Sequence, residues 1–170
     1  MRDDRHKWDF IDDATLPLTA VGVTIALAPI QRQTLVSGPR ILKQFKDASG
    51  WPDVVSQDPY ALAIRRDRVL LVDHDQVPQD GWHDDLEQAV SDATDAYSVY
   101  DISGPNAFEL LKRGGEVSLA VPSRSVARLL FGMGVFLYPY KNPQSFRIHV
   151  GRAHGQAMLQ SLLSCAHHLE

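Results

Sequence analysis

Alternating apolar residues predict strands at the start of the chain. Every second side chain of 21–27 is apolar, so these side chains share one face of a strand that ends before Pro29. Residues 33–36 predict a second strand. A helix then opens at the Ser-Gly-Pro of 37–39 and runs to about Ala48, because apolar residues return there at helical spacing.

The middle of the chain predicts a hairpin and a further strand. Residues 60–64 and 69–72 form the arms of the hairpin, and the second arm is apolar on both faces, as in a buried strand. The pattern of 82–91 fits both a short helix and an extended segment, so both interpretations stay open. Residues 97–102 predict the next strand, and a second Ser-Gly-Pro opens a helix that ends at the glycines 114–115.

The last third of the chain predicts a hairpin, a strand and a helix. The hairpin covers 126–138 and turns at its glycines. The strand of 146–150 alternates apolar residues with Arg147 and His149, so one of its faces is expected to meet water. The final helix covers 151–167, and its apolar side chains form one stripe.

Two stretches of the sequence resemble each other. LVSGPRILKQFK (35–46) and DISGPNAFELLK (101–112) align at an offset of 66 residues, and each predicts a strand, a Ser-Gly-Pro turn and an amphipathic helix. Proline suits a first helical turn because its missing N–H has no partner there, and glycine lets the chain turn sharply. The two copies either mark a structural repeat of two similar halves or are two helices that begin alike. In both cases the fold class is α+β, with about seven or eight mostly antiparallel strands and three or four helices.

The chain divides into one domain and two short ends. Residues 1–15 are dense in charge and are interpreted as a mobile N-terminal arm. Residues 16–168 are expected to form a single α+β domain, since domains commonly contain about 100–200 residues. Residues 169–170 are interpreted as the remnant of an expression vector.

Composition excludes several classes of protein. The chain of 170 residues is 44% hydrophobic, which is enough for a core and excludes wholesale disorder. It carries 17 Lys and Arg against 21 Asp and Glu, a net charge of -4, which argues against nucleic acid as a partner. No apolar run reaches the ~18–20 residues of a membrane span. A single cysteine excludes an internal disulfide and fits a cytoplasmic location.

No motif in the sequence carries recognisable chemistry. The cluster Asp73-His74-Asp75 could attract a metal, but it follows a buried strand and is interpreted as a solvated turn. The glycines of 132–134 lack the third glycine of a dinucleotide-binding loop. Cys165 has no partner residue that would make it a nucleophile and is interpreted as structural. We therefore predict no catalytic, cofactor-binding or metal-binding residue in this chain.

A dense aromatic stretch is the remaining candidate site. Phe136, Tyr138 and Tyr140 share one strand face, and Pro139 favours the edge of a sheet. These aromatic residues either pack in the core or form an interface with another subunit, since large aromatic residues on an edge need cover. They are the candidate interface residues of this sequence.

A resemblance to a known family rests on residues 92–114. The segment reads DATDAYSVYDISGPNAFELLKRG, and its motif positions are Asp92, Ser103, Gly104, Pro105, Ala107, Leu111 and Gly114. It resembles the signature of the gamma subunit of heterotetrameric sarcosine oxidase, and further elements follow in the family's order, so that the resemblance covers roughly 20–166. One departure is the segment 115–119, GEVSL, where the family usually has Cys-Pro-Leu-Asp-Leu.

The resemblance implies a fold and a role. The gamma subunit is similar to the N-terminal portion of folate-dependent aminomethyltransferases, but this chain lacks their later domains. In the family, large flavin-containing subunits carry FAD, FMN and NAD and oxidise sarcosine, and the one-carbon unit passes to tetrahydrofolate or leaves as formaldehyde. No residue of this chain matches a known catalytic position. The resemblance thus implies a non-catalytic subunit that binds no cofactor alone and has the large subunits as partners, with no nucleic acid or membrane.

Two alternatives stay open. The chain could be a freestanding folate-binding or one-carbon transfer domain of the same fold. It could also be a scaffold protein with no link to amine oxidation. The sequence does not specify which N-methyl amine such a complex would oxidise.

Overall fold

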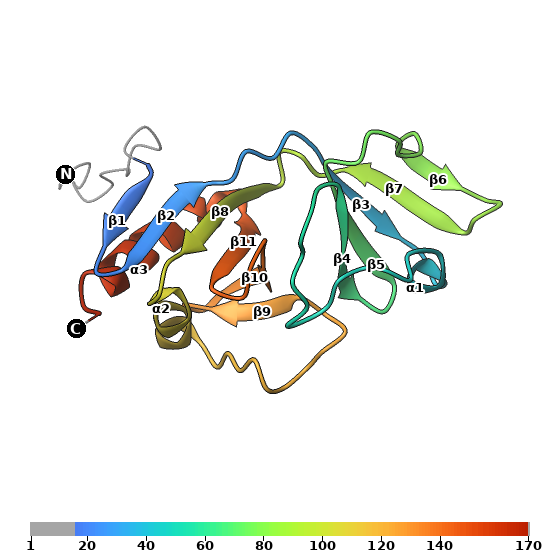
Figure 1. The fold of residues 1–170 in the computed structure, drawn as a ribbon. Coiled ribbons are helices and arrows are strands. Elements are labelled where there is room, and N and C mark those ends of the chain that lie inside the picture. Colours follow the sequence, from blue (N-terminus) through green and yellow to red (C-terminus); the bar gives the residue numbers. More distant parts are fainter. Residues whose placement is uncertain (1–15, 170) are drawn as a thin grey trace, which may run out of the picture.

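Two antiparallel sheets lie side by side in the computed structural model (Figure 1), which describes residues 16–169. The expected arm of 1–15 lies outside the described residues. The six-stranded sheet has the order β1 (Leu18–Ala20), β2 (Val23–Leu27), β8 (Tyr97–Ser103), β11 (Ser145–Gly151), β10 (Met133–Pro139) and β9 (Ala127–Leu130). The five-stranded sheet has the order β4 (Tyr60–Arg65), β5 (Arg68–Val72), β3 (Gln33–Ser37), β7 (Gln88–Asp92) and β6 (Gly81–His83). The α+β class with mostly antiparallel strands is confirmed.

Helices cover the outer face of the six-stranded sheet. They are α2 (Ala107–Gly114) and α3 (Gly155–Ala166), the latter preceded by the 3-10 turn η3 (Arg152–His154). The apolar residues of β8, β10 and β11 point toward these helices and form the largest core cluster, because alternation places them all on one face. Leu169, expected to be a vector remnant, is 5% exposed and packs in this core, and Glu170 lies outside the described residues. None of the helices within 16–169 is long and apolar enough to cross a membrane.

The repeated sequence corresponds to two structurally similar halves. In each sheet a hairpin, β1–β2 or β6–β7, pairs with the strand that ends in Ser-Gly-Pro, β8 or β3. A second hairpin-like pair, β11–β10 or β5–β4, continues each sheet on the other side. The register is the same in both sheets: Ser103 of β8 lies opposite Thr24, and Ser37 of β3 lies opposite Ala89. The first half comprises β1 to β5 and the second half β6 to β11. The six-stranded sheet therefore combines the hairpin β1–β2 of the first half with β8 to β11 of the second, and the five-stranded sheet combines the hairpin β6–β7 of the second half with β3 to β5 of the first.

Two expected elements differ in the structure. The first helix, α1 (Ile41–Gln44), has one turn and does not reach Ala48. It ends because the chain turns back at Phe45 and then runs along β4, where Ser49 and Ala63 form a backbone hydrogen bond of 2.9 Å. The open question over 82–91 is resolved as extended, since β6 and β7 form a hairpin there. The hairpins over 60–72 and 126–138 are confirmed.

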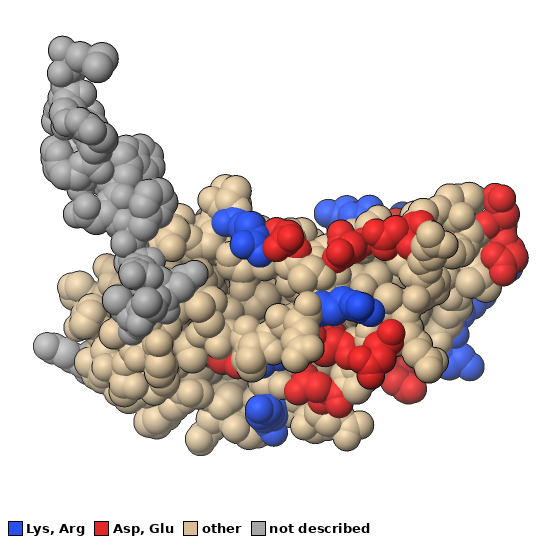
Figure 2. Space-filling model, turned by 90° about the horizontal axis from the view of Figure 1, so that it is seen from above, with Lys and Arg blue, Asp and Glu red and all other residues tan. Residues whose placement is uncertain are grey.

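Charged side chains are unevenly spread over one face. In the view from above, Lys, Arg, Asp and Glu lie mainly over the five-stranded sheet, and the six-stranded sheet shows few of them (Figure 2). Both signs are interspersed, so this face has no continuous basic surface of the kind that binds nucleic acid.

Gly104 joins β8 to α2 at a point where no side chain fits. Its φ is +115°, and a Cβ atom there would overlap the carbonyl oxygen of Gly22 in the β1–β2 turn. That turn is held by Asn106, whose side-chain amide donates to the Val21 carbonyl at 2.9 Å. The motif glycine therefore fixes how the hairpin sits against the helix start.

We expect Gly104→Ala to lower the free energy of unfolding by about 2–3 kcal/mol, since it adds a steric overlap to backbone strain. Gly81→Ala is the matched control, because Gly81 has a φ of +127° but open space around a Cβ. It should cost about 1 kcal/mol. Urea unfolding of both variants provides the measurement. Equal losses would show that contact with Gly22 plays no part.

Candidate functional site: a buried polar network between the sheets

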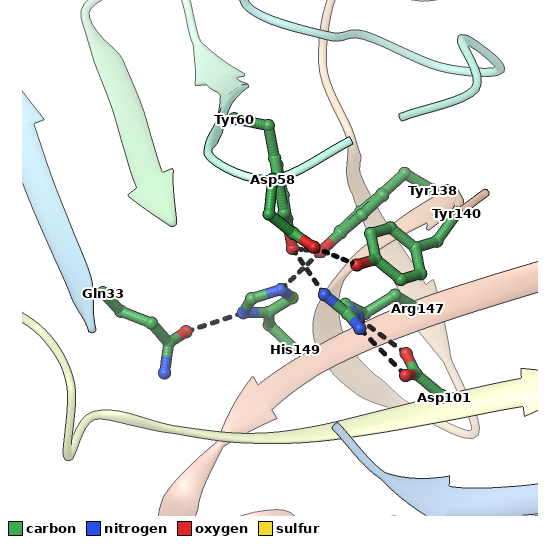
Figure 3. A network of polar contacts seen from close by, with 8 residues as sticks. All are labelled: Gln33, Asp58, Tyr60, Asp101, Tyr138, Tyr140, Arg147 and His149. Atoms are coloured by element: carbon green, nitrogen blue, oxygen red, sulfur yellow. Dashed lines mark hydrogen bonds and ion pairs between the residues drawn. The ribbon is translucent and has the colours of Figure 1, made fainter. Parts of the chain in front are cut away.

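A network of polar side chains fills the region where the two sheets meet (Figure 3). Its members come from distant parts of the sequence and are brought together by the swapped arrangement of the halves. They are Gln33 of β3, Asp58 and Tyr60 at β4, Asp101 of β8, Tyr138 and Tyr140 at β10, and Arg147 and His149 of β11. Alternation places Arg147 and His149 on the face of β11 opposite to the helices, and the five-stranded sheet covers that face.

A single chain of hydrogen bonds runs through this network, and its direction follows from the donors. Arg147 Nη1 donates to the Tyr60 hydroxyl at 3.0 Å, and the Tyr60 and Tyr138 oxygens lie 2.6 Å apart. The Tyr138 hydroxyl lies 2.7 Å from His149 Nε2, and His149 Nδ1 lies 2.7 Å from Oε1 of Gln33. Because Oε1 can only accept, His149 donates from Nδ1 and accepts at Nε2, so Tyr138 donates to His149 and Tyr60 donates to Tyr138.

The amide of Gln33 ends this chain in a fixed orientation. Its Nε2 donates to the Thr94 carbonyl at 3.3 Å, which leaves Oε1 to accept from His149. The Gln33 backbone N–H also donates to the Thr94 hydroxyl at 3.1 Å. Each side-chain polar atom along this run of hydrogen bonds, from Arg147 to Gln33, thus has a partner of the right kind.

Burial keeps His149 neutral. The side chain is fully buried, and loss of water lowers the pKa of His149 to about 3, with the charge of Arg147 as a further cause. A neutral ring has one donor and one acceptor nitrogen, which is what the hydrogen bonds to Gln33 and Tyr138 require. The pKa of His149 therefore stays low only while the folded interior keeps water away from the ring.

The tyrosines stay protonated for the same reason. Burial raises the pKa of Tyr60 to about 12, against the opposing effect of Arg147. Burial, together with the neighbouring Tyr60, raises the pKa of Tyr138 well above its usual value. Both hydroxyls can therefore donate hydrogen bonds throughout the physiological pH range.

Arg147 is the positive charge at the start of this run of hydrogen bonds, and its guanidinium contacts both Asp101 and Tyr140. Its guanidinium makes a bidentate contact with Asp101, with Nε–Oδ1 and Nη2–Oδ2 distances of 2.6 and 2.9 Å. It also lies 3.5 Å above the ring of Tyr140, whose hydroxyl donates to Asp58 at 2.7 Å. Burial lowers the pKa of Arg147, but the hydrogen bonds to Asp101 and the electrostatic effects of Tyr60, Tyr138 and Asp101 together outweigh it, and the pKa is raised overall. The charge is held permanently.

The network is built to hold structure. Tyr138 and His149 are 0% exposed, so no substrate reaches them in this conformation. Each hydroxyl and ring nitrogen is already engaged, which leaves no free base or nucleophile to act on a ligand. The arrangement can align the two sheets, because each hydrogen bond from Tyr60 or Gln33 to the other side joins one sheet to the other.

Two members of this site were misplaced by the sequence pattern. The face of 146–150 that carries Arg147 and His149 was expected to meet water, yet these side chains are 2% and 0% exposed. Alternation identifies which residues share a face but not whether a second sheet covers that face. The available signal was the aromatic face of the neighbouring strand, since Tyr138 lies directly opposite Arg147 in the ladder.

The expected edge position of the aromatic residues is wrong. β10 pairs with β11 on one side and with β9 on the other, so Pro139 lies at the end of an inner strand. Tyr138 is fully buried and Tyr140 is 5% exposed, while Phe136 packs against Tyr97 with ring centroids 5.2 Å apart. Tyr138 and Tyr140 therefore pack in the interior of the folded chain, whereas Phe136 is partly exposed.

The seven motif residues of 92–114 either shape turns of the chain or pack in the core. Asp92 ends β7, and its carboxylate accepts the Thr94 N–H at 2.8 Å; hydrogen bonds from Thr94 lower the pKa of Asp92. Ala107 and Leu111 of α2 are fully buried in the core. A Cβ on Gly114 would lie 2.7 Å from side-chain atoms of Leu130 and Phe131, so glycine lets the end of α2 contact the β9–β10 turn. The other three, Ser103, Gly104 and Pro105, make the sharp turn into α2.

The acidic turn after β5 also has a structural explanation. Asp73 Oδ1 accepts the backbone N–H groups of Gln31 and Arg32, both at 2.9 Å. It thereby fixes the entry to β3, as expected for a polar turn. Within 16–169, no three His, Cys, Asp or Glu side chains come together as metal ligands. Cys165 is a free, partly buried cysteine of α3.

Comparison with known proteins supports the fold. No protein-family profile matches the sequence, and no curated protein sequence matches it. Among solved structures, the chain is similar to one in heterotetrameric sarcosine oxidase from Corynebacterium sp. U-96 in complex with pyrrole 2-carboxylate, with a TM-score of 0.61 and 17% identity over 91% of this chain and 88% of that chain. A second is glycine cleavage system aminomethyltransferase T from Bartonella henselae, with a TM-score of 0.47 and 12% identity over 85% of this chain and 46% of that chain. The first similarity confirms the fold that residues 92–114 suggested.

Proposed function

We propose that this chain is a small, non-catalytic subunit of a flavoenzyme complex of the heterotetrameric sarcosine oxidase type. It would assemble with large flavin-containing subunits that oxidatively demethylate sarcosine or a related N-methyl amine in one-carbon metabolism. FAD, FMN, NAD and tetrahydrofolate would then belong to those partner subunits.

The observation that carries this proposal is the extent of the structural match. It covers almost all of this chain and almost all of a chain in the solved heterotetramer, so the two chains have nearly the same length. A match of this kind supports a role like that of the matched chain in a multi-subunit oxidase. The motif of 92–114 independently resembles that of a small subunit of this type of complex.

The polar network is consistent with this role. Its side chains are buried and paired with one another, which suits a rigid building block whose surface meets other subunits. The motif residues likewise shape the turn between β8 and α2. Chemistry would be left to the flavin-bearing partners.

Co-expression with flavoprotein genes next to its own gene tests the proposal. We expect the tagged chain to co-purify with the large subunits in fixed stoichiometry, and the complex to form hydrogen peroxide when sarcosine or another N-methyl amine is added. The chain expressed alone should be colourless, without flavin, nicotinamide or stoichiometric metal.

Two other results would contradict the assignment. A yellow preparation of the isolated chain with near one flavin per chain would show that it is a flavoprotein itself. Binding of tetrahydrofolate by the isolated chain, together with one-carbon transfer and no association with flavoproteins, would favour a freestanding domain of the same fold.

A further inference from the structure

An open pocket of about 490 Å³ lies between α1 and the segment that follows it, the middle of β4 and the loop before β9. Leu42 and Phe45 from the α1 segment, Trp51 and Ala63 form its apolar walls. Lys46 and Arg124 add two cations at the same site, and Asp53 adds one acid. Asp53 is already engaged, since its Oδ2 accepts the Gly50 N–H at 3.1 Å. The volume lies in the range of about 300–1,000 Å³ that is usual for small-molecule sites.

The internal repeat shows that this pocket is special to the first half of the chain. Leu42 and Phe45 align with Phe108 and Leu111 of α2. In the second half, Phe108 stacks on the ring of Phe146 at 5.8 Å and Leu111 is fully buried under α3. In the first half, no helix equivalent to α3 follows β5, so Leu42 and Phe45 stay partly exposed and line the pocket.

The two aligned segments, 41–46 and 107–112, carry different charges. Lys112 of α2 forms an ion pair with Glu109 at 2.7 Å. Lys46 aligns with Lys112, but the position of Glu109 is taken by Lys43, a second cation. Within residues 16–169, no carboxylate forms an ion pair with Lys46 or Arg124. The first half thus presents free positive charge beside an apolar wall, in a chain whose net charge is -4.

We propose that this pocket binds a small organic anion. An apolar body of the size of an aromatic ring would lie against the partly exposed Leu42 and Phe45, beside the 2% exposed Trp51, and a carboxylate or phosphate would lie between Lys46 and Arg124. Unpaired cations beside aromatic walls suit such a ligand, because the charged group gains charge-assisted hydrogen bonds while the ring buries apolar surface. The inference does not depend on the subunit role proposed above.

Titration of the ¹⁵N-labelled full chain tests the site. The Trp51 indole N–H is the reporter, since Trp51 lines the pocket and its N–H is held by a hydrogen bond of 2.7 Å to the Ser118 carbonyl, and exposed Trp82 is the internal reference. Benzoate and phenylphosphonate are the anionic probes, and benzyl alcohol is the neutral probe of similar shape. We expect saturable shifts of the Trp51 signal with one or both anions and affinity at least about tenfold weaker for the alcohol.

Matched variants identify the cations. Lys46→Gln and Arg124→Gln should each weaken binding about tenfold, the usual effect of one lost charged hydrogen bond. Lys112→Gln, at the aligned position of the other half, should leave affinity unchanged. All three side chains are exposed, so the variants are expected to fold, and their spectra check this.

Several results would overturn the proposal. These are no saturable Trp51 shift with either anion, equal affinity for benzyl alcohol, or equal affinity of the Lys46→Gln, Arg124→Gln and Lys112→Gln variants. Shifts of Trp51 with an acidic peptide, but with neither small anion, would assign the pocket to a protein partner and also overturn it.

Discussion

We expect Arg147→Met to lower the free energy of unfolding by about 3 kcal/mol. The substitution keeps an apolar stem but removes the guanidinium, so Asp101 loses both of its charged hydrogen bonds and the Tyr60 oxygen loses its donor. Breaking a buried ion pair by removing one partner commonly costs about 3–5 kcal/mol. The lower end applies because the Asp101 side chain is 29% exposed and regains some water.

Arg152→Met is the matched control for this loss. Arg152 also pairs with an aspartate, Asp95, at 2.9 Å, but the two side chains are 60% and 96% exposed. Surface pairs of this kind contribute about 0–1 kcal/mol, so the control should unfold almost like the wild type. Urea unfolding of both variants provides the comparison. Equal losses would mean that the buried Arg147 pair contributes no more than a surface one.

The fold was largely predictable because local patterns determine most of its elements. Alternation over 23–27 and 146–150, the turn signals of the hairpins and the two Ser-Gly-Pro sequences each correspond to an element of the structure, although residues 21–22 of the expected first strand form the turn before β2. The similarity at an offset of 66 residues leaves open whether the chain has two similar halves, and the strand orders of the two sheets show that it does. Where prediction failed, tertiary contact overrode the local pattern: residues after Gln44 leave helical geometry because they run along β4.

The polar network was not predictable because the swap of hairpins between the halves cannot be read from local patterns. The repeat also gives no hint of it, since the two halves differ at these positions. Arg147 and Asp101 lie opposite each other in β11 and β8, and the equivalent residues of β5 and β3 are Leu70 and Leu35. Tyr138 in the second half corresponds to Leu62 in the first.

The leucines at these positions show that the equivalent register positions of the five-stranded sheet accept apolar side chains. The same register positions pack as apolar residues in one sheet and as an ion pair with hydrogen bonds in the other. Polar groups in the interior add little net stability when paired, but they fix relative position because each has directional partners. We infer that the network sets the alignment of the two sheets, on which any surface shared by both would depend.

We expect the stability of the chain to fall with pH below about 6.5 because of His149. The unfolded chain has an ordinary histidine with a pKa near 6.5, whereas burial lowers the pKa of His149 to about 3 in the folded chain. Between these values only the unfolded chain binds the proton, so acid favours unfolding. Each pH unit in this window costs about 1.4 kcal/mol, which gives a loss of about 2 kcal/mol between pH 6.5 and 5.

The groups facing His149 keep the effect specific to this residue. Tyr138 and Tyr60 stay neutral because their pKa values are raised, and Arg147 stays charged, so none of them titrates in this window. Nδ1 of the ring already donates to Gln33 and Nε2 accepts from Tyr138, so a second ring proton would displace the proton that Tyr138 donates. Protonation in the folded state is therefore opposed by the donor order of these hydrogen bonds as well as by burial.

Urea unfolding at pH 7, 6 and 5 measures the effect in the wild type, in His149→Gln and in His154→Gln. His149→Gln should be less stable at pH 7, because glutamine does not reproduce both hydrogen bonds, but its stability should fall by about 2 kcal/mol less on going to pH 5. His154, an exposed residue of η3, is the control, and its replacement should leave the wild-type pH dependence in place. If His149→Gln loses as much stability as the wild type over this range, then His149 already binds a proton in the folded chain and the hydrogen-bond direction assigned to the network is wrong.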